Sequence, residues 1–551
     1  MYIIIAGEEA GPISNKLGGI WSVIDAEARN LAKISLDEIV VAGPYFERLG
    51  QDWSPKSRIT DLTGFEPVED KKFLEVLDRT GIDYRAVKKE GEEGIKYVFF
   101  NAESCLSKRV SYKGSDMRLS DAVKAEAYNL LGLDSLKYEN TTYGGEYTHY
   151  LCLSYAVSQL VSGLASEDKV SLQCHEFPVF YASARLEKLS VPVKSVATFH
   201  ATKVGRAWGA RTFEKVLMGD ATLPIDIQHG LMELEKLASY SDVVTFVSNN
   251  TRNESKLFYG IDGIVIRNGI ELSANSVNWN KKTRNLQKMQ SFLADSLRRV
   301  NGLAIEDKAI VPIFTISRLE VENKGYPDLL DSLVILDRVI KNKVDNKEID
   351  EVKVFCILIT ALGPKDPQKL PPGFPISLGD EMLIGDELRL KRMIDERGLG
   401  VGDISRRNVC ALLYPQWLSK EDGGFNMTLD EISSACVAGI FPSRYDPFLL
   451  TALEACSEAC PVVLSKACGF SGAVRELQQQ KGIYGGVILV DNIEQSYLQA
   501  ITDYALGLCI IIDAFLRDWV KDRMMCDVAF MLAREMDWES PVRSYYEILK
   551  E

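Results

Sequence analysis

Apolar and polar residues follow two repeated patterns along this chain. Short apolar runs rich in Val and Ile alternate with longer stretches in which apolar residues recur every three or four positions. This alternation of strand and helix patterns is typical of parallel α/β sheets. A first set of strands is predicted at Ile3–Ala6, Glu38–Ala42, Tyr97–Asn101, Val170–Cys174, Val193–Phe199 and Val243–Val247. A second set is predicted at Ile310–Ile316, Lys353–Ile359, Ala411–Tyr414, Ala438–Pro442, Pro461–Leu464 and Val487–Val490.

The two sets predict two Rossmann-like domains. A chain of 551 residues is also longer than one hydrophobic core usually supports. We expect an N-terminal domain over 1–271 and a C-terminal domain over 308–515, joined by a connector over 272–307 with a helix around Leu286–Arg299. The remaining helical segment, 516–551, is expected to pack back on the first domain.

Composition and charge exclude several classes of protein. The net charge of −14 argues against general nucleic-acid binding, which needs a basic surface. Apolar runs such as Val354–Leu362 and Leu508–Ile512 are shorter than the roughly 20 residues of a membrane span. The start, Met-Tyr-Ile-Ile-Ile-Ala-Gly, has the pattern of a strand and not of a signal peptide, so a cytoplasmic location is expected. The 11 cysteines contain no Cys-x-x-Cys pair and predict free thiols without a zinc site.

The first candidate motif is the segment Asn15-Lys16-Leu17-Gly18-Gly19-Ile20, between the first predicted strand and a helical pattern. Paired glycines let backbone N–H groups approach a phosphate at the start of a helix. A plain tight turn has the same composition, and this alternative stays open for the segment alone.

Two further motifs follow predicted strands, at the sheet edge where α/β proteins bind ligands. His200 and Arg206 follow the strand that ends at Phe199, although a hydrogen-bonded structural histidine would look the same. Arg318 and Lys324 follow the strand that ends at Ile316, within Ser-Arg-Leu-Glu-Val-Glu-Asn-Lys-Gly. Two cations at this spacing can clamp a diphosphate, but a solvated surface pair fits the spacing equally well.

The last motif is Phe441-Pro442-Ser443-Arg444-Tyr445-Asp446-Pro447-Phe448, which continues to Glu454. If a helix begins near Pro447, Asp446 and Glu454 lie on one of its faces, about two turns apart. Carboxylates in that arrangement suit sugar hydroxyls. An acidic helix cap followed by an ordinary helical glutamate is the alternative.

Taken together, the four segments resemble the eukaryotic-type glycogen synthase family, in the family's order along the chain. The family has Asn-Lys/Arg-Val-Gly-Gly-Ile, Thr-His-Ala-Thr ending in Gly-Arg, Gly-Arg-x-Glu-x-x-Asn-Lys-Gly, and Tyr-Glu-Pro-Trp-Gly-Tyr-Thr-Pro-Ala-Glu. Shorter matches lie at Gly43–Tyr45, His175-Glu176, Tyr414–Leu418 and Met536–Trp538.

The resemblance implies a GT-B fold, with two Rossmann-like domains facing a central cleft, and retaining transfer of glucose. The donor would be UDP-glucose, or ADP-glucose, and the acceptor the non-reducing end of an α-1,4-glucan. No metal or other cofactor is implied, and the chain contains no Asp-x-Asp sequence. Assembly into homo-oligomers, tetramers in the family, is implied as well, whereas nucleic-acid and membrane partners are not.

By matching positions, the resemblance also implies roles for single residues. Arg318 and Lys324 would neutralise the leaving diphosphate, while His200 and Asp446 would contact the transferred glucose. Those four are the implied catalytic residues. The implied donor-binding residues are Lys16, Gly18, Gly19, Arg206, Trp417, Tyr445 and Glu454, with Glu454 on the ribose.

Three positions depart from the family's pattern. Asp446 is one methylene shorter than the usual glutamate, Leu449 replaces a glycine near the phosphates, and Leu429 replaces an aromatic residue near the base. Two alternatives therefore stay open: a related glycosyltransferase with another donor or a small acceptor, and a silent homologue that binds glucan. The chain also lacks an arginine-dense C-terminal helix, so we expect no response to glucose 6-phosphate.

Overall fold

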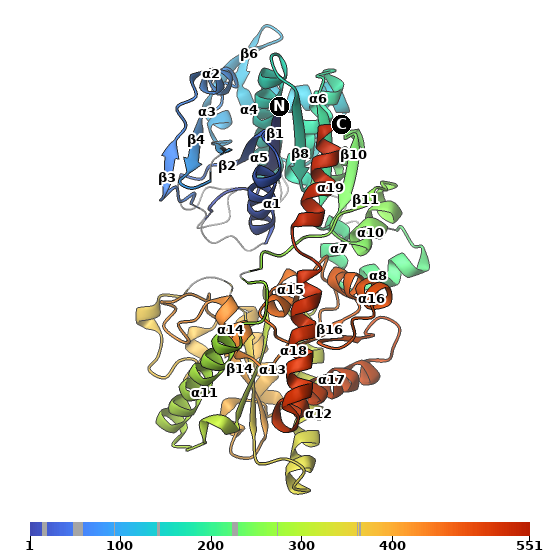
Figure 1. Ribbon diagram of the computed structural model, residues 1–551. Coiled ribbons are helices and arrows are strands. Elements are labelled where there is room, and N and C mark those ends of the chain that lie inside the picture. Colours follow the sequence, from blue (N-terminus) through green and yellow to red (C-terminus); the bar gives the residue numbers. More distant parts are fainter. Residues whose placement is uncertain are drawn as a thin grey trace. The chain divides into compact units, whose positions relative to one another are not determined.

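The structure, a computed structural model, describes residues 1–551 except 14–18, 48–58, 93, 140–143, 223–229, 273, 361 and 363–364. The chain divides into two compact units. The first unit comprises Met1–Trp208, Lys215–Gly269 and Trp538–Glu551, and the second comprises Gly209–Glu214 and Ile270–Asp537. Each unit is built on its own sheet (Figure 1).

The first unit contains a nine-stranded sheet in the order β11-β10-β9-β8-β1-β2-β5-β4-β3. Its parallel strands are β1 (Tyr2–Gly7), β2 (Glu38–Pro44), β5 (Ile95–Phe100), β8 (Val170–His175), β9 (Lys194–Phe199), β10 (Val243–Phe246) and β11 (Ile264–Val265). The six strands predicted for this domain are confirmed. The antiparallel edge strands β3 (Phe65–Pro67) and β4 (Tyr84–Lys89), and the separate hairpin of β6 (Arg109–Tyr112) and β7 (Ser115–Arg118), were not predicted.

Helices cover both faces of this sheet (Figure 1). One face carries α5 (Gly144–Ala165) and α6 (Phe180–Lys188), with α2 (Lys71–Arg79) and α4 (Leu119–Leu131) packed on α5. The other face carries α1 (Ile20–Ile34) and the C-terminal helix α19 (Glu539–Lys550). Further helices are α3 (Ser104–Ser107), α7 (Lys203–Trp208), α8 (Ala210–Met218), α9 (Gly230–Lys236) and α10 (Asn249–Tyr259). Because helices bury both faces, the central strands β1, β2 and β8 are buried along almost their whole length, and most of their residues are apolar.

The second unit has a six-stranded parallel sheet in the order β14-β13-β12-β15-β16-β17. The strands are β12 (Ile310–Ile316), β13 (Lys353–Ile359), β14 (Val409–Tyr414), β15 (Ala438–Phe441), β16 (Val462–Ser465) and β17 (Val487–Val490). All six were predicted. The helices are α11 (Trp279–Asn301), α12 (Tyr326–Asp345), α13 (Asp386–Glu396), α14 (Leu429–Ala435), α15 (Leu450–Ser457), α16 (Gly469–Lys481), α17 (Tyr497–Arg517) and α18 (Trp519–Arg534).

Two segments at the predicted domain boundaries belong to compact units. The predicted connector, 272–307, lies in the second unit, where α11 packs on α14 and β12. The segment 516–551 is divided between the units: α18 packs on α15 and α17, whereas α19 packs on α1, β8 and β9 of the first unit. Burial of an apolar helix face decides which unit each segment joins.

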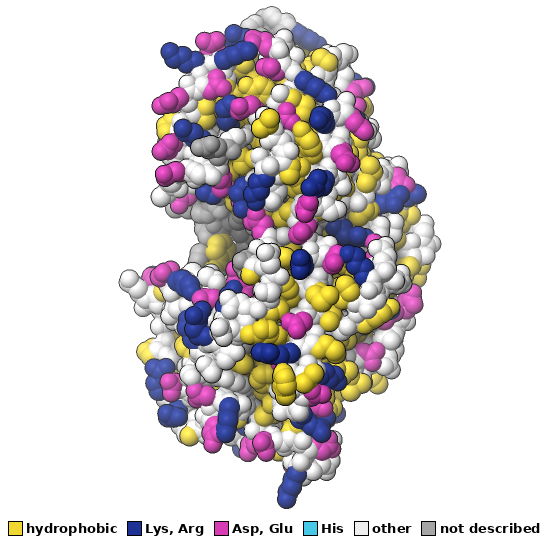
Figure 2. Space-filling view, in the orientation of Figure 1, with side chains coloured by type: hydrophobic (Ala, Val, Ile, Leu, Met, Phe, Trp, Pro, Cys, Tyr) yellow, Lys and Arg dark blue, Asp and Glu magenta, His cyan; other side chains and the backbone are white. Residues whose placement is uncertain are grey.

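One helix, α17, is long and apolar enough to cross a membrane by length and composition alone. It packs along α12, and 56% of its most apolar window is buried inside the structure, as in the core helix of a soluble protein. Figure 2 shows hydrophobic side chains gathered over α17 and α18. The exposed ones include Leu498, Leu506, Ile510, Trp519, Val520, Met524 and Met531.

Candidate active site

In the second unit, the strand order reverses between β12 and β15. Ligands of open α/β sheets bind at the carboxyl ends of the strands at such a switch point. The loop after β12 contains Arg318 and Lys324, and the loop after β15 contains Arg444 and Asp446. The topology therefore brings two of the predicted motifs to one place, although they are more than a hundred residues apart.

Backbone contacts hold these two loops together. The amides of Arg444 and Tyr445 both donate to the carbonyl of Asn323, at 2.8 and 3.1 Å. Gly325 has φ of +67°, and a Cβ at this position would lie 2.0 Å from the carbonyl oxygen of Pro442. Only glycine permits this close approach, so the glycine of the Asn-Lys-Gly sequence is required by the crossing of the loops.

The loop crossing places Lys324 against Asp446. Nζ of Lys324 lies 2.7 Å from Oδ2 of Asp446, and the side chains are only 8% and 14% exposed. The other carboxylate oxygen, Oδ1, accepts a hydrogen bond from the amide of Phe448 at 3.2 Å. Asp446 precedes α15 by four residues and closes a turn, so the predicted arrangement of Asp446 and Glu454 on one helix face is wrong.

Arg318 lies at the same loop but is more exposed than Lys324. Its side chain is 42% exposed and its guanidinium lies 3.5 Å from Glu320. Arg444, for which no role is predicted, makes a bidentate ion pair with Asp328 of α12 and so anchors the second loop. Arg318 is thus left as an exposed cation beside the buried Lys324–Asp446 pair.

The helix after the second loop, α15, begins at an unusual residue. Leu449 precedes it with φ of 78° and ψ of 60°, the left-handed region, which costs a residue with a Cβ roughly 1–2 kcal/mol. Its side chain is 5% exposed, and burial of this leucine offsets the cost of the backbone conformation. No side chain caps α15, so the N–H groups at its start are available to an anion.

Three further predicted residues surround this loop crossing. Burial, and then the charge of Asp430 on α14, raises the pKa of Glu454 to about 7. Trp417 is half-buried and follows β14 in a loop held by the buried Gln416, whose amide donates to the carbonyls of Lys365 and Asp422. Tyr445 is buried, with its ring 6.1 Å from that of Phe213 in the second unit.

In the first unit, the corresponding switch point lies between β1 and β8. His175 ends β8 and His200 follows β9; Nδ1 of His175 lies 2.8 Å from Nε2 of His200. The backbone amides of His200 and Ala201 donate to the carboxylate of Glu176 at 2.8 and 2.7 Å. Glu176 has φ of 71°, a strained conformation that its own hydrogen bonds hold in place.

These contacts make His200 a buried, neutral ring. Burial, and then the charge of Arg206, lowers the pKa of His200 to about 3. Arg206 itself lies on α7 with an exposed side chain. Sequence reasoning found His200 and Arg206 but gave no role to His175 and Glu176, although the His-Glu pair was recognised as similar to the family.

The glycine motif is only partly described. Lys16 and Gly18 lie outside the described residues. Gly19 precedes α1 with φ of −89° and ψ of 0°, which any residue can adopt, and caps the helix without a side chain. The roles implied for these three residues therefore stay predictions.

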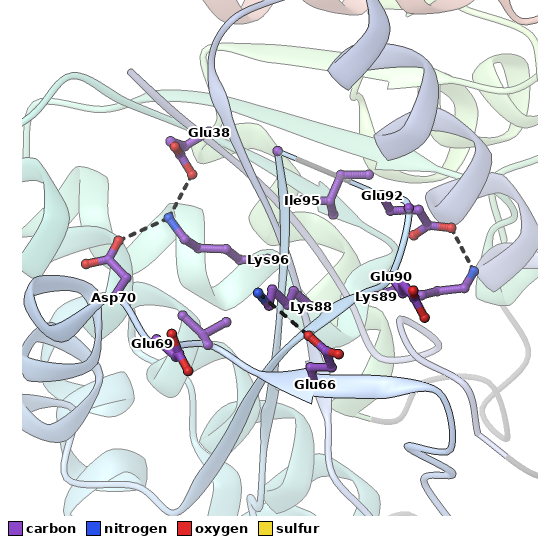
Figure 3. A pocket seen from close by; sticks show the side chains of 13 residues that line it. Glu38, Glu66, Glu69, Asp70, Lys88, Lys89, Glu90, Glu92, Ile95 and Lys96 are labelled. Atoms are coloured by element: carbon purple, nitrogen blue, oxygen red, sulfur yellow. Dashed lines mark hydrogen bonds and ion pairs between the residues drawn. The ribbon is translucent and has the colours of Figure 1, made fainter.

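A pocket of about 410 Å³ lies apart from both switch points, at the β3–β4 edge of the first sheet (Figure 3). Each of its three lysines pairs with a carboxylate that also lines the pocket. Lys96 contacts Glu38 and Asp70, Lys88 contacts Glu66, and Lys89 contacts Glu92. Since these carboxylates are satisfied within the pocket, we assign it no ligand. Within the described part of the chain, no three His, Cys, Asp or Glu side chains gather to hold a metal ion.

Comparison with solved structures defines the fold. The catalytic domain of starch synthase IV from Arabidopsis thaliana, bound to ADP and acarbose, superposes with a TM-score of 0.55 at 14% identity, covering 100% of this chain and 98% of the other. A UDP-forming α,α-trehalose-phosphate synthase from Burkholderia xenovorans superposes with a TM-score of 0.53 at 12% identity, with the same coverage. The fold is that of GT-B glycosyltransferases, as predicted.

Comparison with known sequences finds relatives among the glycogen synthases, although no family model matches the chain. Glycogen [starch] synthase isoform 2 of Saccharomyces cerevisiae is 21% identical over 88% of this chain and 77% of its own length. The mouse liver enzyme is 22% identical over 91% and 77%. The Dictyostelium discoideum glycogen [starch] synthase is 24% identical, but the match spans only 43% of its length. The chain is a glycosyltransferase, homologous to the eukaryotic-type glycogen synthases.

Proposed function

We propose that this chain transfers glucose, with retention of configuration, from a nucleotide sugar to the non-reducing end of an α-1,4-glucan. UDP-glucose is the favoured donor, ahead of ADP-glucose. Homologues named glycogen [starch] synthase in yeast, mouse and Dictyostelium support the proposal. The observation that carries it is the buried pair of Lys324 and Asp446 at the switch point of the second unit.

Lys324 and Arg318 serve the departing diphosphate in this proposal. Negative charge develops on the phosphate oxygens as the bond to the anomeric carbon breaks, and fixed cations stabilise it most where water is excluded. Asp446 holds Lys324 in place and offers a carboxylate to the glucose hydroxyls. The uncapped start of α15 adds backbone N–H groups at the same loop.

The chemical step involves one bond exchange and one proton. The bond between the anomeric carbon and the phosphate oxygen breaks, and a bond to the acceptor hydroxyl oxygen forms on the same face of the sugar. The proton of that hydroxyl passes to the leaving phosphate oxygen. Atoms and charge balance without a metal ion or other cofactor.

The remaining residues orient the donor. Glu454 accepts hydrogen bonds from the ribose, Trp417 lies beside the base, and Tyr445 supports the loop that carries Asp446. His200 contacts the transferred glucose and Arg206 contributes charge at the same loop. Lys16, Gly18 and Gly19 close over the phosphates. A cytoplasmic location and assembly into homo-oligomers, tetramers in the family, complete the proposal.

A panel of substrates tests this function. The purified chain is incubated with glycogen and, separately, with UDP-glucose, ADP-glucose and other nucleotide sugars, and nucleotide release is measured. Release with a glucose donor that depends on glycogen supports the proposal. A second function, transfer from another donor or to a small acceptor, is favoured by Leu449, Leu429 and Asp446, and turnover only with such substrates would establish it. Binding of glycogen without any turnover would identify a silent homologue.

A further inference from the structure

Three buried side chains of the first unit form a line from α1 to the loop after β9. Glu27 on α1 and His175 at the end of β8 have fully buried side chains, and His200 is 7% exposed. Nε2 of His175 lies 3.6 Å from Oε2 of Glu27, and Nδ1 of His175 lies 2.8 Å from Nε2 of His200. Two ring nitrogens at that distance share one proton, so the proton position on one ring determines the position on the other.

The Glu27 end of the line has few other partners. Both carboxyl oxygens of Glu27 and Nε2 of His175 are fully buried, and none of the three has a partner within hydrogen-bond distance and angle among the described residues. The side chain of Gln173 is a further polar neighbour of Glu27. A buried polar atom without a partner is costly. Closing the 3.6 Å contact by a few tenths of an ångström would satisfy Glu27 and His175 together.

Burial also determines how many protons the line holds. Burial, and then the charge of His200, lowers the pKa of His175 well below its ordinary value. Burial also lowers the pKa of His200 to about 3. Both rings are therefore neutral at pH 7. Burial raises the pKa of Glu27 to about 8, with the neighbouring Gln173 opposing the shift, so its carboxyl is protonated at pH 7. The other ionisable group that faces Glu27 is Tyr545 of α19, whose pKa is raised by burial and which therefore stays neutral.

The direction of each hydrogen bond follows from this count. A protonated Glu27 donates to Nε2 of His175, so the proton of His175 lies on Nδ1 and is donated to Nε2 of His200. The proton of His200 then lies on its own Nδ1. This atom has no hydrogen-bond partner within the described part of the chain and is not among its fully buried polar atoms. When Glu27 loses its proton, the hydrogen bond between Glu27 and His175 and the one between His175 and His200 both reverse direction. Nδ1 of His200 then carries a lone pair instead of a proton.

We propose that Glu27 is a positioning residue that acts through His175 to hold the proton of the neutral His200 ring on Nδ1. His200 then offers a hydrogen-bond donor, and not an acceptor, to an oxygen of the sugar donor. Only the identity of that oxygen rests on the proposed function. The position of the proton is a property of the protein without substrate.

Nitrogen-15 NMR of the full chain tests the proton position directly. The chain contains only four histidines, so the ring signals of histidine-labelled protein can be assigned with His175→Asn and His200→Asn. At pH 6.5–7, roughly one unit below the value for Glu27, we expect the proton of His200 on Nδ1. Raising the pH through 8 should move it to Nε2, because ionised Glu27 accepts a hydrogen bond from Nε2–H of His175, whose Nδ1 then accepts one from Nε2–H of His200.

Two variants and one control separate the proposal from a structural role. Glu27→Gln keeps an N–H donor towards His175, so its His200 should keep the Nδ1 proton up to pH 9.5. Glu27→Leu removes the donor and should abolish the preference at every pH. Asp25→Asn, which breaks the pair with Arg29 at 3.0 Å on the same helix, should behave as the unmodified chain does. If Glu27→Leu does not fold, the position of the His200 proton in Glu27→Gln above pH 8 is enough to test the proposal.

Turnover gives a second readout. The unmodified chain should lose kcat as the pH rises through about 8, whereas Glu27→Gln should not. Glu27→Leu should lower kcat roughly 10- to 100-fold, by analogy with the loss of groups that orient metal-ligating histidines. A His200 proton on Nε2 at pH 7, or identical pH behaviour of Glu27→Gln and the unmodified chain, would overturn the proposal. Absence of glucosyl transfer would refute the proposed function and leave the NMR result to decide.

Discussion

Replacement of Asp446 by asparagine tests the pair at the centre of the second unit. The change keeps the shape of the side chain but removes the charge that faces Lys324 at 2.7 Å. Hydrogen bonds to charged groups contribute about 1.5–3 kcal/mol, so loss of contact with the glucose hydroxyls should lower kcat/KM roughly 10- to 150-fold. The buried Lys324 is also left without its counter-charge, which lowers stability.

The assay follows nucleotide release with glycogen as acceptor, with circular dichroism and the thermal midpoint as tests of folding. Lys324→Met and the double variant complete a mutant cycle. Because the two side chains are in contact, their effects should not add, and the double variant should be little slower than the worse single one. Asp446→Glu, the family's residue, should retain activity. A rate for Asp446→Asn equal to that of the unmodified chain would show that Asp446 only closes the turn at Phe448.

Four further outcomes are expected. Arg318→Ala should lower turnover roughly 100-fold or more, as loss of a hydrogen-bond donor to the transition state does. The thermal midpoint should stay unchanged because the side chain is exposed. Turnover equal to that of the unmodified chain would show that Arg318 does not contact the diphosphate. EDTA should not change activity, since the chain has no Asp-x-Asp sequence, and rescue by Mn²⁺ or Mg²⁺ would contradict this. The KM for the sugar donor should fall as the pH rises through about 7, because Glu454 ionises there. In Glu454→Gln the KM should no longer change over this pH range. If the KM of the variant changes with pH as that of the unmodified chain does, another group is responsible for the pH dependence. Glucose 6-phosphate should change neither rate nor donor KM, and several-fold activation would reveal a basic site that we have not identified.

The strands could be predicted because their sequence pattern is local. Most central strands are short and mainly apolar runs, since helices cover both faces of a parallel sheet. The carboxyl ends of β12 and β15 were therefore predictable as ligand-binding positions. The start of α15 was not, because the helix begins after a leucine in the left-handed conformation, which a leucine rarely adopts.

Contacts between distant residues could not be predicted from spacing. The Lys324–Asp446 pair joins residues 122 positions apart, and its geometry depends on the close approach at Gly325. Glu27 was not singled out because a glutamate in a helical pattern is usually exposed, yet this one is fully buried against His175. The division of 516–551 between the units was also missed, since a helical pattern alone does not say which unit α18 and α19 pack against.

The linkage formed with a short acceptor tests the central claim most directly. The unmodified chain is incubated with UDP-glucose and a maltooligosaccharide, and the product is examined by mass spectrometry and by the anomeric proton signals in NMR. The account predicts stepwise addition of glucose in α-1,4 linkage at the non-reducing end. A β-linked product, or no extension with any nucleotide sugar while the folded chain still binds glycogen, would contradict it.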